Sequence, residues 1–253
     1  MPREQIDAPP FLLVTGGSRG IGAEIVRGAA ERGWAVAFSY ERDADAAGRL
    51  EDAVCAAGGT ALALRCDVAD PDAVAALFAD AEAALGPVKG LVNNAGVTGR
   101  LGAFVDTEVA TMRRVLEVNV LGTMLCAQAA AGRWRDRGTP GVMVNISSIA
   151  ATLGAPGEYV HYAASKAAVE AFTIGLAKEL APAGSRVNAV APGTAHTGIH
   201  AAAGEPGRPA RVAARIPMGR AAEPSEIAEA VLWLLSPQAS YVTGAVLRVS
   251  GGL

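Results

Sequence analysis

Short apolar runs alternate along the whole chain with longer, alanine-rich stretches, and this alternation constrains the fold more than any other feature. Near the start, the apolar run 11–14 precedes a helical pattern over 20–32 and a second apolar run over 35–39. Because each connection is long enough to form a helix, the strands are expected to lie parallel in one sheet. The expected strands are 11–14, 35–39, 61–65, 88–93, 142–146, 187–191 and 245–249, and the expected helices are 20–32, 44–57, 72–85, 107–135, 159–180 and 224–235.

This pattern predicts an α/β fold of the Rossmann type, a doubly wound parallel sheet of about seven strands flanked by helices. Hydrophobic residues make up 51% of the chain, which is enough apolar surface for a single domain over residues 1–253 without disulfides or metals. Residues 1–10 are predicted to form a polar N-terminal tail. Residues 194–217 are rich in Gly and Pro and lack clean periodicity, so we predict a substrate lid there.

Charge, cysteine content and hydropathy argue against several classes of function. The net charge is -3 and the basic residues are scattered, so we expect no nucleic-acid partner and no membrane partner. Cys55, Cys66 and Cys126 are not paired in the sequence, and we interpret them as free core thiols in a reducing compartment. Since no stretch approaches the roughly 18 apolar residues of a membrane span, a cytoplasmic protein is expected.

The histidines give no reason to expect a metal. His196 and His200 are four residues apart, but Gly198 lies between them and no H-E-x-x-H pattern surrounds them. We expect both to lie in the lid.

A glycine-rich turn follows the first predicted strand and leads directly into a helix. Its pattern, G-x-x-x-G-x-G over 16–22, lets the backbone approach a pyrophosphate, whose charge is favoured by the helix N-terminus. A plain strand-to-helix turn is the alternative, although the position after the first strand favours a dinucleotide site. The residues predicted to contact the cofactor here are Gly16, Ser18, Arg19, Gly20, Ile21 and Gly22.

The end of the second predicted strand, where dinucleotide sites often carry an acid, reads Ser39-Tyr40-Glu41-Arg42. Arg19 and Arg42 could together pair with a ribose 2'-phosphate, which favours NADP(H) over NAD(H). Tyr40 is expected to line the same site. Glu41 could instead bind a ribose hydroxyl and favour NAD, and Arg42 could simply be a solvated surface charge.

Tyr162 and Lys166 are four residues apart, so they lie on one face of a predicted helix. A phenol normally has a pKa near 10, and a neighbouring ammonium would lower it and make the hydroxyl a useful acid. Ser147 and Ser148 follow the strand 142–146, where a hydroxyl could hold a substrate oxygen. Surface packing of the Tyr and Lys pair is the alternative.

The order and spacing of these motifs, together with Asn93-Asn94-Ala95-Gly96, closely resemble the classical short-chain dehydrogenases/reductases over nearly the whole chain. The resemblance implies that Tyr162 is the acid/base, that Lys166 lowers its pKa and binds the nicotinamide ribose, and that Ser148 orients the reacting oxygen. It also implies that Asn119 anchors a water for a proton relay. The further cofactor-binding residues that it implies are Asp67, Val68, Asn94, Ala95, Gly96, Pro192, Gly193, Thr194 and Thr197.

Other interpretations of these residues stay open. Asp67 could be a helix cap, Asn119 a buried hydrogen-bonding residue, and the run 93–96 a plain turn. The gap from Ser148 to Tyr162 is one residue longer than the family's commonest spacing, so Ser147 is an alternative to Ser148. A loop over 153–157 could absorb the extra residue.

The resemblance also implies a homotetramer, because the family usually assembles through its long helices.

The sequence as a whole predicts an NADP(H)-dependent oxidoreductase. It would transfer a hydride between nicotinamide and the carbonyl or alcohol carbon of a small substrate, with proton transfer by Tyr162. Within the family, the stretch 154–166 resembles glucose-dehydrogenase-like and 3-oxoacyl-carrier-protein-reductase-like members. A dinucleotide-binding sensor or scaffold without turnover is the alternative.

Overall fold

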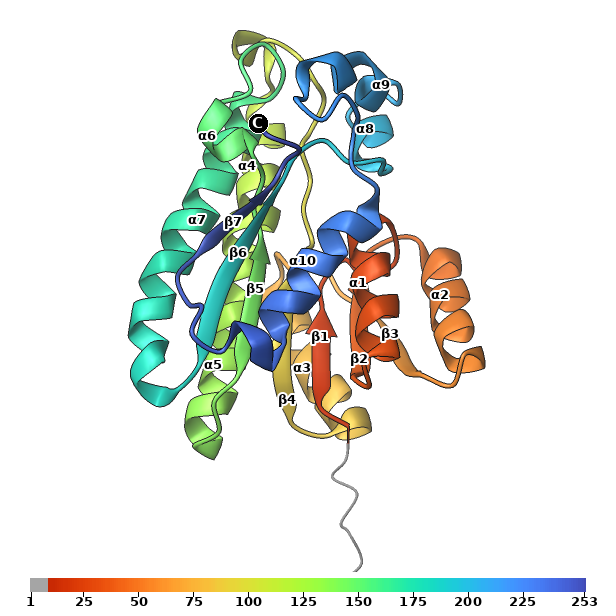
Figure 1. Ribbon diagram of the computed structural model, residues 1–253, viewed down its shortest axis with the longest axis vertical. Helices are drawn as coiled ribbons and strands as arrows, with labels where there is room; N and C mark the ends of the chain where they lie inside the picture. The colour runs from red at the N-terminus through yellow and green to blue at the C-terminus, as the bar shows by residue number, and fades with distance from the viewer. Residues whose placement is uncertain (1–8) are drawn as a thin grey trace, which may run out of the picture.

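The computed structural model describes residues 9–253 and shows a parallel sheet with helices on both faces (Figure 1). Of the predicted polar tail, residues 1–8 lie outside the described residues. The described residues form seven strands in the order β3-β2-β1-β4-β5-β6-β7, and each neighbouring pair is parallel. The strand order reverses between β1 and β4, since β2 and β3 lie on one side of β1 and β4 to β7 lie on the other. This reversal confirms the predicted doubly wound topology. The strands are β1 (Phe11–Val14), β2 (Ala35–Tyr40), β3 (Thr60–Arg65), β4 (Val88–Asn93), β5 (Val142–Ile146), β6 (Arg186–Pro192) and β7 (Val246–Val249).

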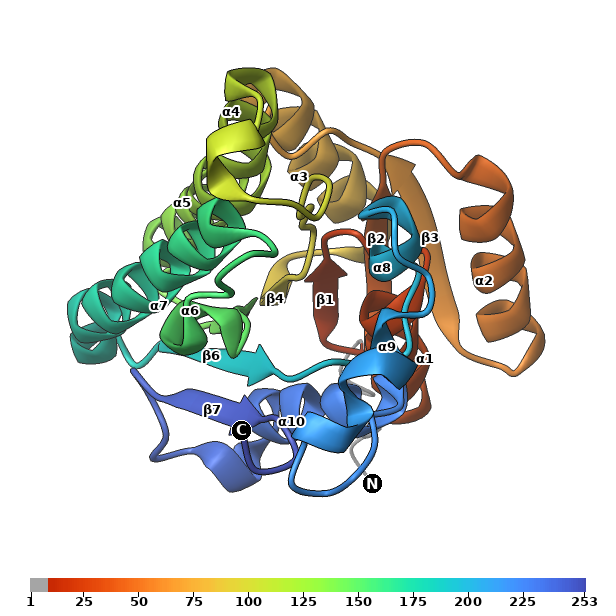
Figure 2. The same cartoon turned by 90° about the horizontal axis from the view of Figure 1, so that it is seen from above.

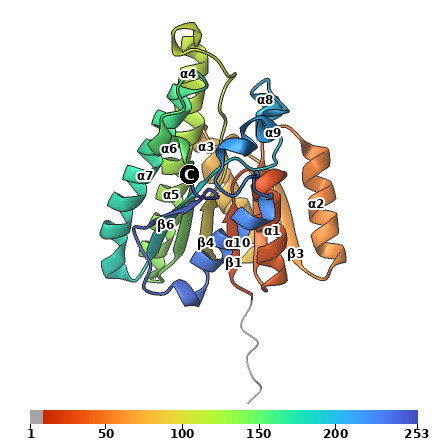
Figure 3. The same cartoon turned by 45° about the horizontal axis from the view of Figure 1, so that its top comes forward.

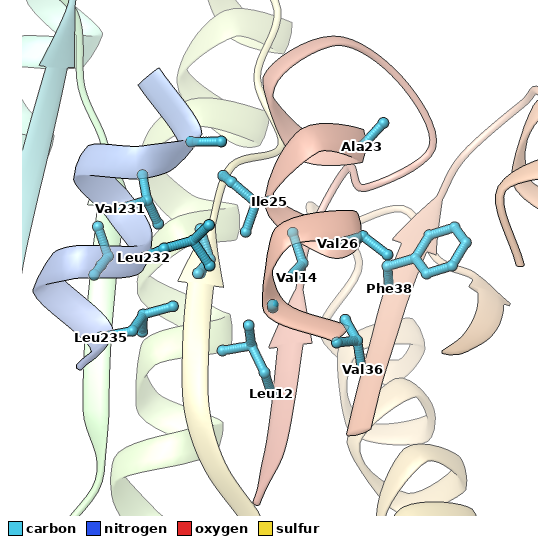
Figure 4. Packing of buried hydrophobic residues seen from close by; sticks show 14 of the residues in the cluster. Leu12, Val14, Ala23, Ile25, Val26, Val36, Phe38, Val231, Leu232 and Leu235 are labelled. Carbon is cyan, nitrogen blue, oxygen red and sulfur yellow. The ribbon is translucent and has the colours of Figure 1, made fainter. Parts of the chain in front are cut away.

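The central strands contribute side chains to a hydrophobic core on each face of the sheet. Leu12 and Val14 of β1 pack toward one face, while Phe11 and Leu13 pack toward the other. A strand buried on both sides must be apolar at every position, which is why 11–14 reads as a continuous apolar run. Figure 4 shows Leu232 and other side chains of the first core. Helices α1 (Gly20–Glu31), α2 (Ala44–Ala56) and α10 (Pro224–Leu235) cover the first face, and α3 (Pro71–Leu85), α5 (Thr123–Arg137) and α7 (Val160–Leu180) cover the second.

The helix predicted over 107–135 is a continuous helical stretch from Val109 to Arg137. It comprises α4 (Val109–Leu116), a π-helical turn η2 (Glu117–Gly122) and α5. By length and composition alone it could cross a membrane, which corrects the expectation that no stretch of the chain would qualify. Here it serves as a packing helix, since α5 contacts α3 and β4 and α4 contacts α7.

The segment predicted as a lid contains two short helices that its composition did not suggest. They are α8 (Ile199–Ala202) and α9 (Arg208–Val212), and Pro209 occupies one of the first positions of α9, where a missing N–H costs nothing. Figures 2 and 3 show both helices at the end of the molecule to which the strands point, facing α4 and the short helix α6 (Ala150–Leu153).

One of the three cysteines does not fit the prediction of core thiols. Cys66 and Cys126 are buried, but Cys55 is exposed on α2. The helix buries Ala47, Leu50 and Val54 against the sheet, so Cys55 falls outside the buried stripe.

Candidate active site

A cleft of about 870 Å³ opens at the carboxyl ends of the strands, beside the reversal between β1 and β4. This is the place where doubly wound sheets bind their ligands. Of the residues predicted to catalyse or to bind cofactor, Gly22 and Asn119 do not line it. Those that do are Gly16, Ser18, Arg19, Gly20, Ile21, Tyr40, Arg42, Asp67, Val68, Asn94, Ala95, Gly96, Ser148, Tyr162, Lys166, Pro192, Gly193, Thr194 and Thr197.

The glycine turn is closed by contacts that a larger residue could not make. Gly16 and Gly20 have φ values of +62° and +56°, in the left-handed region that glycine adopts readily. A Cβ on Gly22 would lie 2.3 Å from the carbonyl oxygen of Gly16, so Gly22 supports the turn from beneath. Within the described residues, α1 has no side-chain cap, and its first N–H groups can therefore receive an anion.

Asn94 holds the glycine turn against β4. Its Nδ2 donates to the carbonyl oxygens of Thr15 and Gly16 at 3.0 and 2.8 Å, and its backbone N–H donates to Oγ1 of Thr15 at 3.0 Å. Asn93, by contrast, faces the sheet interior, where its Nδ2 donates to Asn145 at 2.9 Å. The run 93–96 is thus more than a plain turn, because Asn94 fixes the glycine turn and Asn93 fixes the sheet beneath it.

Tyr162 lies buried at the start of α7, facing the cleft. Burial raises the pKa of its phenol above the usual value, while Ser148 and the charge of Arg208 act in the opposite direction. The ring of Tyr159 meets that of Tyr162 edge to face, with ring centroids 5.1 Å apart. Tyr159 therefore supports the ring of Tyr162, and Ser148 influences its hydroxyl.

Lys166 lies one helical turn from Tyr162 and is also buried. Its Nζ donates to the carbonyl oxygen of Ile146 at 2.7 Å and lies 5.7 Å from the centre of the Tyr162 ring. Burial lowers the pKa of Lys166 to about 8. The groups that lower the pKa of Tyr162 in this structure are Ser148 and Arg208, and the effect of Lys166 on the phenol stays a prediction.

The two neighbouring serines after β5 have different partners. Ser147 donates to Oε1 of Glu170 at 2.8 Å and is fully engaged inside the protein. Ser148 lines the cleft with Tyr162 and lowers the pKa of its phenol, and its Oγ accepts from the N–H of Ala150 at 3.1 Å. In the stretch 153–157, which was expected to absorb an extra residue, Gly154, Ala155 and Gly157 have positive φ values. The geometry thus favours Ser148 over Ser147 as the partner of the reacting oxygen.

Asn119 lies in the π-helical turn and is completely buried. Its Oδ1 accepts from the N–H of Val97 at 2.8 Å, and its Nδ2 donates to the carbonyl of Val97 and to Oγ of Ser165 at 2.9 and 3.0 Å. These bonds tie the cleft wall to α7, which agrees with the alternative of a buried hydrogen-bonding residue. The anchoring of a water by Asn119 stays a prediction.

An unpredicted arginine joins the acids at the end of the cleft near β2 and β3. Arg114 of α4 donates to Asp67 at 2.9 Å and to Glu41 at 3.1 Å. Arg114 pairs with residues more than forty positions away in sequence, so local pattern offered no signal for it. Asp67 accepts from the N–H of Ala69, whereas Asp70 caps α3, so Asp67 is not the helix cap.

The lid is fastened to the cleft wall by charged residues that the sequence analysis missed. Arg208 of α9 donates to Glu158 at 2.5 Å and to Thr194 at 3.3 Å, and its guanidinium covers the ring of Tyr159.

Two further lid residues have contacts inside the protein. Thr197 lies against the glycine turn, within 3.2 Å of the position that a Cβ on Gly20 would occupy. The buried His200 shares a hydrogen bond with the carbonyl of Ala195 at 2.9 Å, inside the lid as expected.

Comparison with known proteins shows to which family the chain belongs. Residues 16–253 match the family model described as enoyl-(acyl carrier protein) reductase. The chain belongs to the short-chain dehydrogenase/reductase family. It is an oxidoreductase of that family, with the family's dinucleotide-binding fold.

Three similar proteins support this membership. An uncharacterized oxidoreductase YgfF of Escherichia coli (strain K12) is 43% identical over 95% of this chain and 98% of its own. A short-chain type dehydrogenase/reductase from Mycobacterium marinum superposes with a TM-score of 0.91 at 34% identity, over 96% of this chain and 95% of that one. A blue fluorescent protein from a metagenomic library, solved in complex with NADPH, has a TM-score of 0.87 at 35% identity, over 97% and 98% of the two chains.

Proposed function

We propose that the chain is an NADP(H)-dependent oxidoreductase that transfers a hydride between nicotinamide and a carbonyl or alcohol carbon, with Tyr162 as acid/base. The observation that carries the proposal is that Tyr162, together with Ser148 and Lys166, lines the same cleft as the glycine turn. The cleft thus combines a proton donor with a site for a pyrophosphate. A small alcohol or carbonyl compound is the proposed substrate, with residues 194–217 as its lid.

The residues of the cleft fit a nicotinamide dinucleotide. Its volume of about 870 Å³ is ample for an extended ligand, and the N-terminus of α1 opens into it without a side-chain cap among the described residues. Gly16 to Ile21 and Thr197 would hold the phosphates, Asp67 and Val68 the adenine, and Lys166 the nicotinamide ribose. When bound, the nicotinamide supplies or accepts the hydride.

Tyr162 and Ser148 then carry out and direct the proton transfer. As a carbonyl is reduced, negative charge grows on its oxygen, and Tyr162 donates its phenolic proton there. Ser148 donates a hydrogen bond to the same oxygen and so orients it. In alcohol oxidation the same groups act in reverse. Burial keeps the phenol protonated at neutral pH, which suits it to the role of acid.

The preference for NADP(H) rests on cationic groups at the β2 end of the cleft. Arg19 and Arg42 both line it, and either can pair with a 2'-phosphate. The NADPH complex of the blue fluorescent protein supports the proposal by analogy. Glu41 opposes this preference, because its carboxylate could bind a ribose hydroxyl and favour NAD.

The deciding experiment is a parallel titration with NADPH and NADH, followed by turnover on a panel of carbonyls and alcohols. NADPH-selective binding with turnover is the expected result. Tyr162→Phe should bind NADPH as the wild type does but lose turnover, because it lacks only the hydroxyl that transfers the proton. Full activity in that variant would refute the mechanism, and tight binding without any turnover would favour a dinucleotide sensor.

We further propose that the protein is a cytoplasmic homotetramer. Leu116, Met124 and Ile174 are exposed on α4, α5 and α7, and burying them between subunits would be favourable. Light scattering on the purified protein measures the oligomeric state directly. A monomer at micromolar concentration would overturn this proposal.

A further inference from the structure

Arg114 lies between two carboxylates at the adenine end of the cleft. One of its terminal nitrogens contacts Asp67 at 2.9 Å, and the other contacts Glu41 at 3.1 Å. Glu41 follows the last residue of β2, Asp67 follows β3 and Arg114 comes from α4, so three separate elements meet through one guanidinium. All three residues line the cleft.

Arg114 is held more firmly than the neighbouring Arg42. The side chain of Arg114 is 33% exposed, and hydrogen bonding to Asp67 with the nearby acidic charge raises its pKa although burial opposes this. Arg42 is 83% exposed and reaches Glu41 only at 3.3 Å. The fixed positive charge beside Glu41 is therefore that of Arg114.

Glu41 lies at a position where a carboxylate affects the relative affinity for NADH and NADPH. An unpaired carboxylate at the end of the second strand accepts hydrogen bonds from the ribose hydroxyls of NADH and repels the 2'-phosphate of NADPH. Arg114 shares its positive charge between Glu41 and Asp67, so it reduces the negative charge that Glu41 presents to a phosphate. Arg42 contacts Glu41 through one terminal nitrogen only, so its other N–H groups are available for the phosphate.

We infer that Arg114 determines cofactor selectivity by neutralising Glu41, so that a chain with an acid at this position accepts NADPH. The inference rests on the proposed function. Arg114 is a specificity-determining residue in this account, although it acts through Glu41 and not on the phosphate alone. Without it, Glu41 would keep only its longer contact with the exposed Arg42, and Glu41 and Asp67 together would present net negative charge to NADPH.

The test is a cycle of four proteins: the wild type, Arg114→Met, Glu41→Gln and the double variant. Nucleotide fluorescence gives Kd for NADPH and NADH in each. Arg114→Met should shift the ratio of the two Kd values toward NADH by about tenfold, as expected for losing one charge-assisted contact at a partly exposed site. Glu41→Gln should shift it toward NADPH, and in that background Arg114→Met should change the ratio by less than about twofold.

Arg113→Met is the matched control, because Arg113 is the adjacent arginine on α4 and forms no ion pair with a described residue. It should leave the ratio unchanged. Equal weakening of both cofactors by Arg114→Met, or the same shift in the Glu41→Gln background, would overturn the inference but leave the proposed function intact. Failure of the wild type to bind either nucleotide would instead overturn the proposed function and the inference with it.

Discussion

Ser147 donates a hydrogen bond to the carboxylate of Glu170 at 2.8 Å, whereas the adjacent Ser148 is the serine that lowers the pKa of Tyr162. The two serines can therefore be separated by mutation. Ser148→Ala should lower kcat by about 100-fold, because it removes a donor to the reacting oxygen and a group that lowers the pKa of the phenol. Ser147→Ala should change kcat less than about threefold and cost stability instead. Steady-state kinetics with unfolding curves for both variants distinguish these outcomes, and equal kcat losses would contradict the assignment.

Much of the fold follows from the sequence because it depends on local pattern. The central strands of this sheet are short and largely buried on both faces, so an apolar run such as 11–14 marks its strand directly, and the helices between the strands are long enough to show their periodicity. The two lid helices escaped prediction because helices of one turn carry too little periodicity to detect. Their stability comes from contacts such as that of Arg208 with Glu158.

Part of the candidate site could also be predicted from the sequence, and part of it could not. The glycine turn, Tyr162 and Lys166 follow from residue type and spacing, because their neighbours in the sequence are also neighbours in space. Arg114 and Arg208 could not be predicted, since each finds its acidic partner on another element. The depressed pKa of Lys166 likewise depends on burial that no spacing reveals.

The glycine turn offers a test of cofactor binding that is separate from catalysis. Gly22→Ala places a Cβ 2.3 Å from the Gly16 carbonyl oxygen and should weaken binding of both nucleotides at least about 100-fold, because the turn must open. Gly132→Ala, on α5 with open space around its Cβ, should leave binding unchanged and stabilise the protein by about 1 kcal/mol. Fluorescence titration and urea unfolding measure the two effects. Wild-type affinity in Gly22→Ala would exclude this turn as the pyrophosphate site.

The ion pairs of Glu158 should keep the lid in place. Its carboxylate meets both Arg208 and Arg211 of α9, and these bonds hold its pKa below the usual value although burial opposes this. Glu158→Gln should therefore loosen α9, raise KM about tenfold and speed tryptic cleavage after Arg211. Glu205→Gln is the control, because the carboxylate of Glu205 bonds only to Arg211 among the described residues. Equal proteolysis of both variants would show that Glu158 does not hold the lid.

Glu82 should make the protein sensitive to acid. Its carboxylate accepts from Arg137, from Arg133 and from the N–H of Val88. Burial opposes ionisation, yet these bonds outweigh it and lower the pKa of Glu82 from 4.5 to about 2. A pKa that is lower in the folded state stabilises the protein above the unfolded value, and this stability is lost as pH falls from 4.5 toward 2.

Replacing the carboxylate tests this directly. Glu82→Gln should lower the free energy of unfolding at pH 7 by up to about 3 kcal/mol, because the neutral amide gives up the ionic bonds to both arginines. The difference from the wild type should shrink as pH falls below the unfolded pKa of Glu82, since protonation removes the same charge from the wild-type protein. Glu24→Gln, which disrupts the exposed pair with Arg27, should cost less than about 0.5 kcal/mol at any pH. Urea unfolding at several pH values measures all three proteins, and a Glu82→Gln deficit that stays constant down to low pH would mean that packing around the side chain, and not its charge, is what stabilises this corner of the fold.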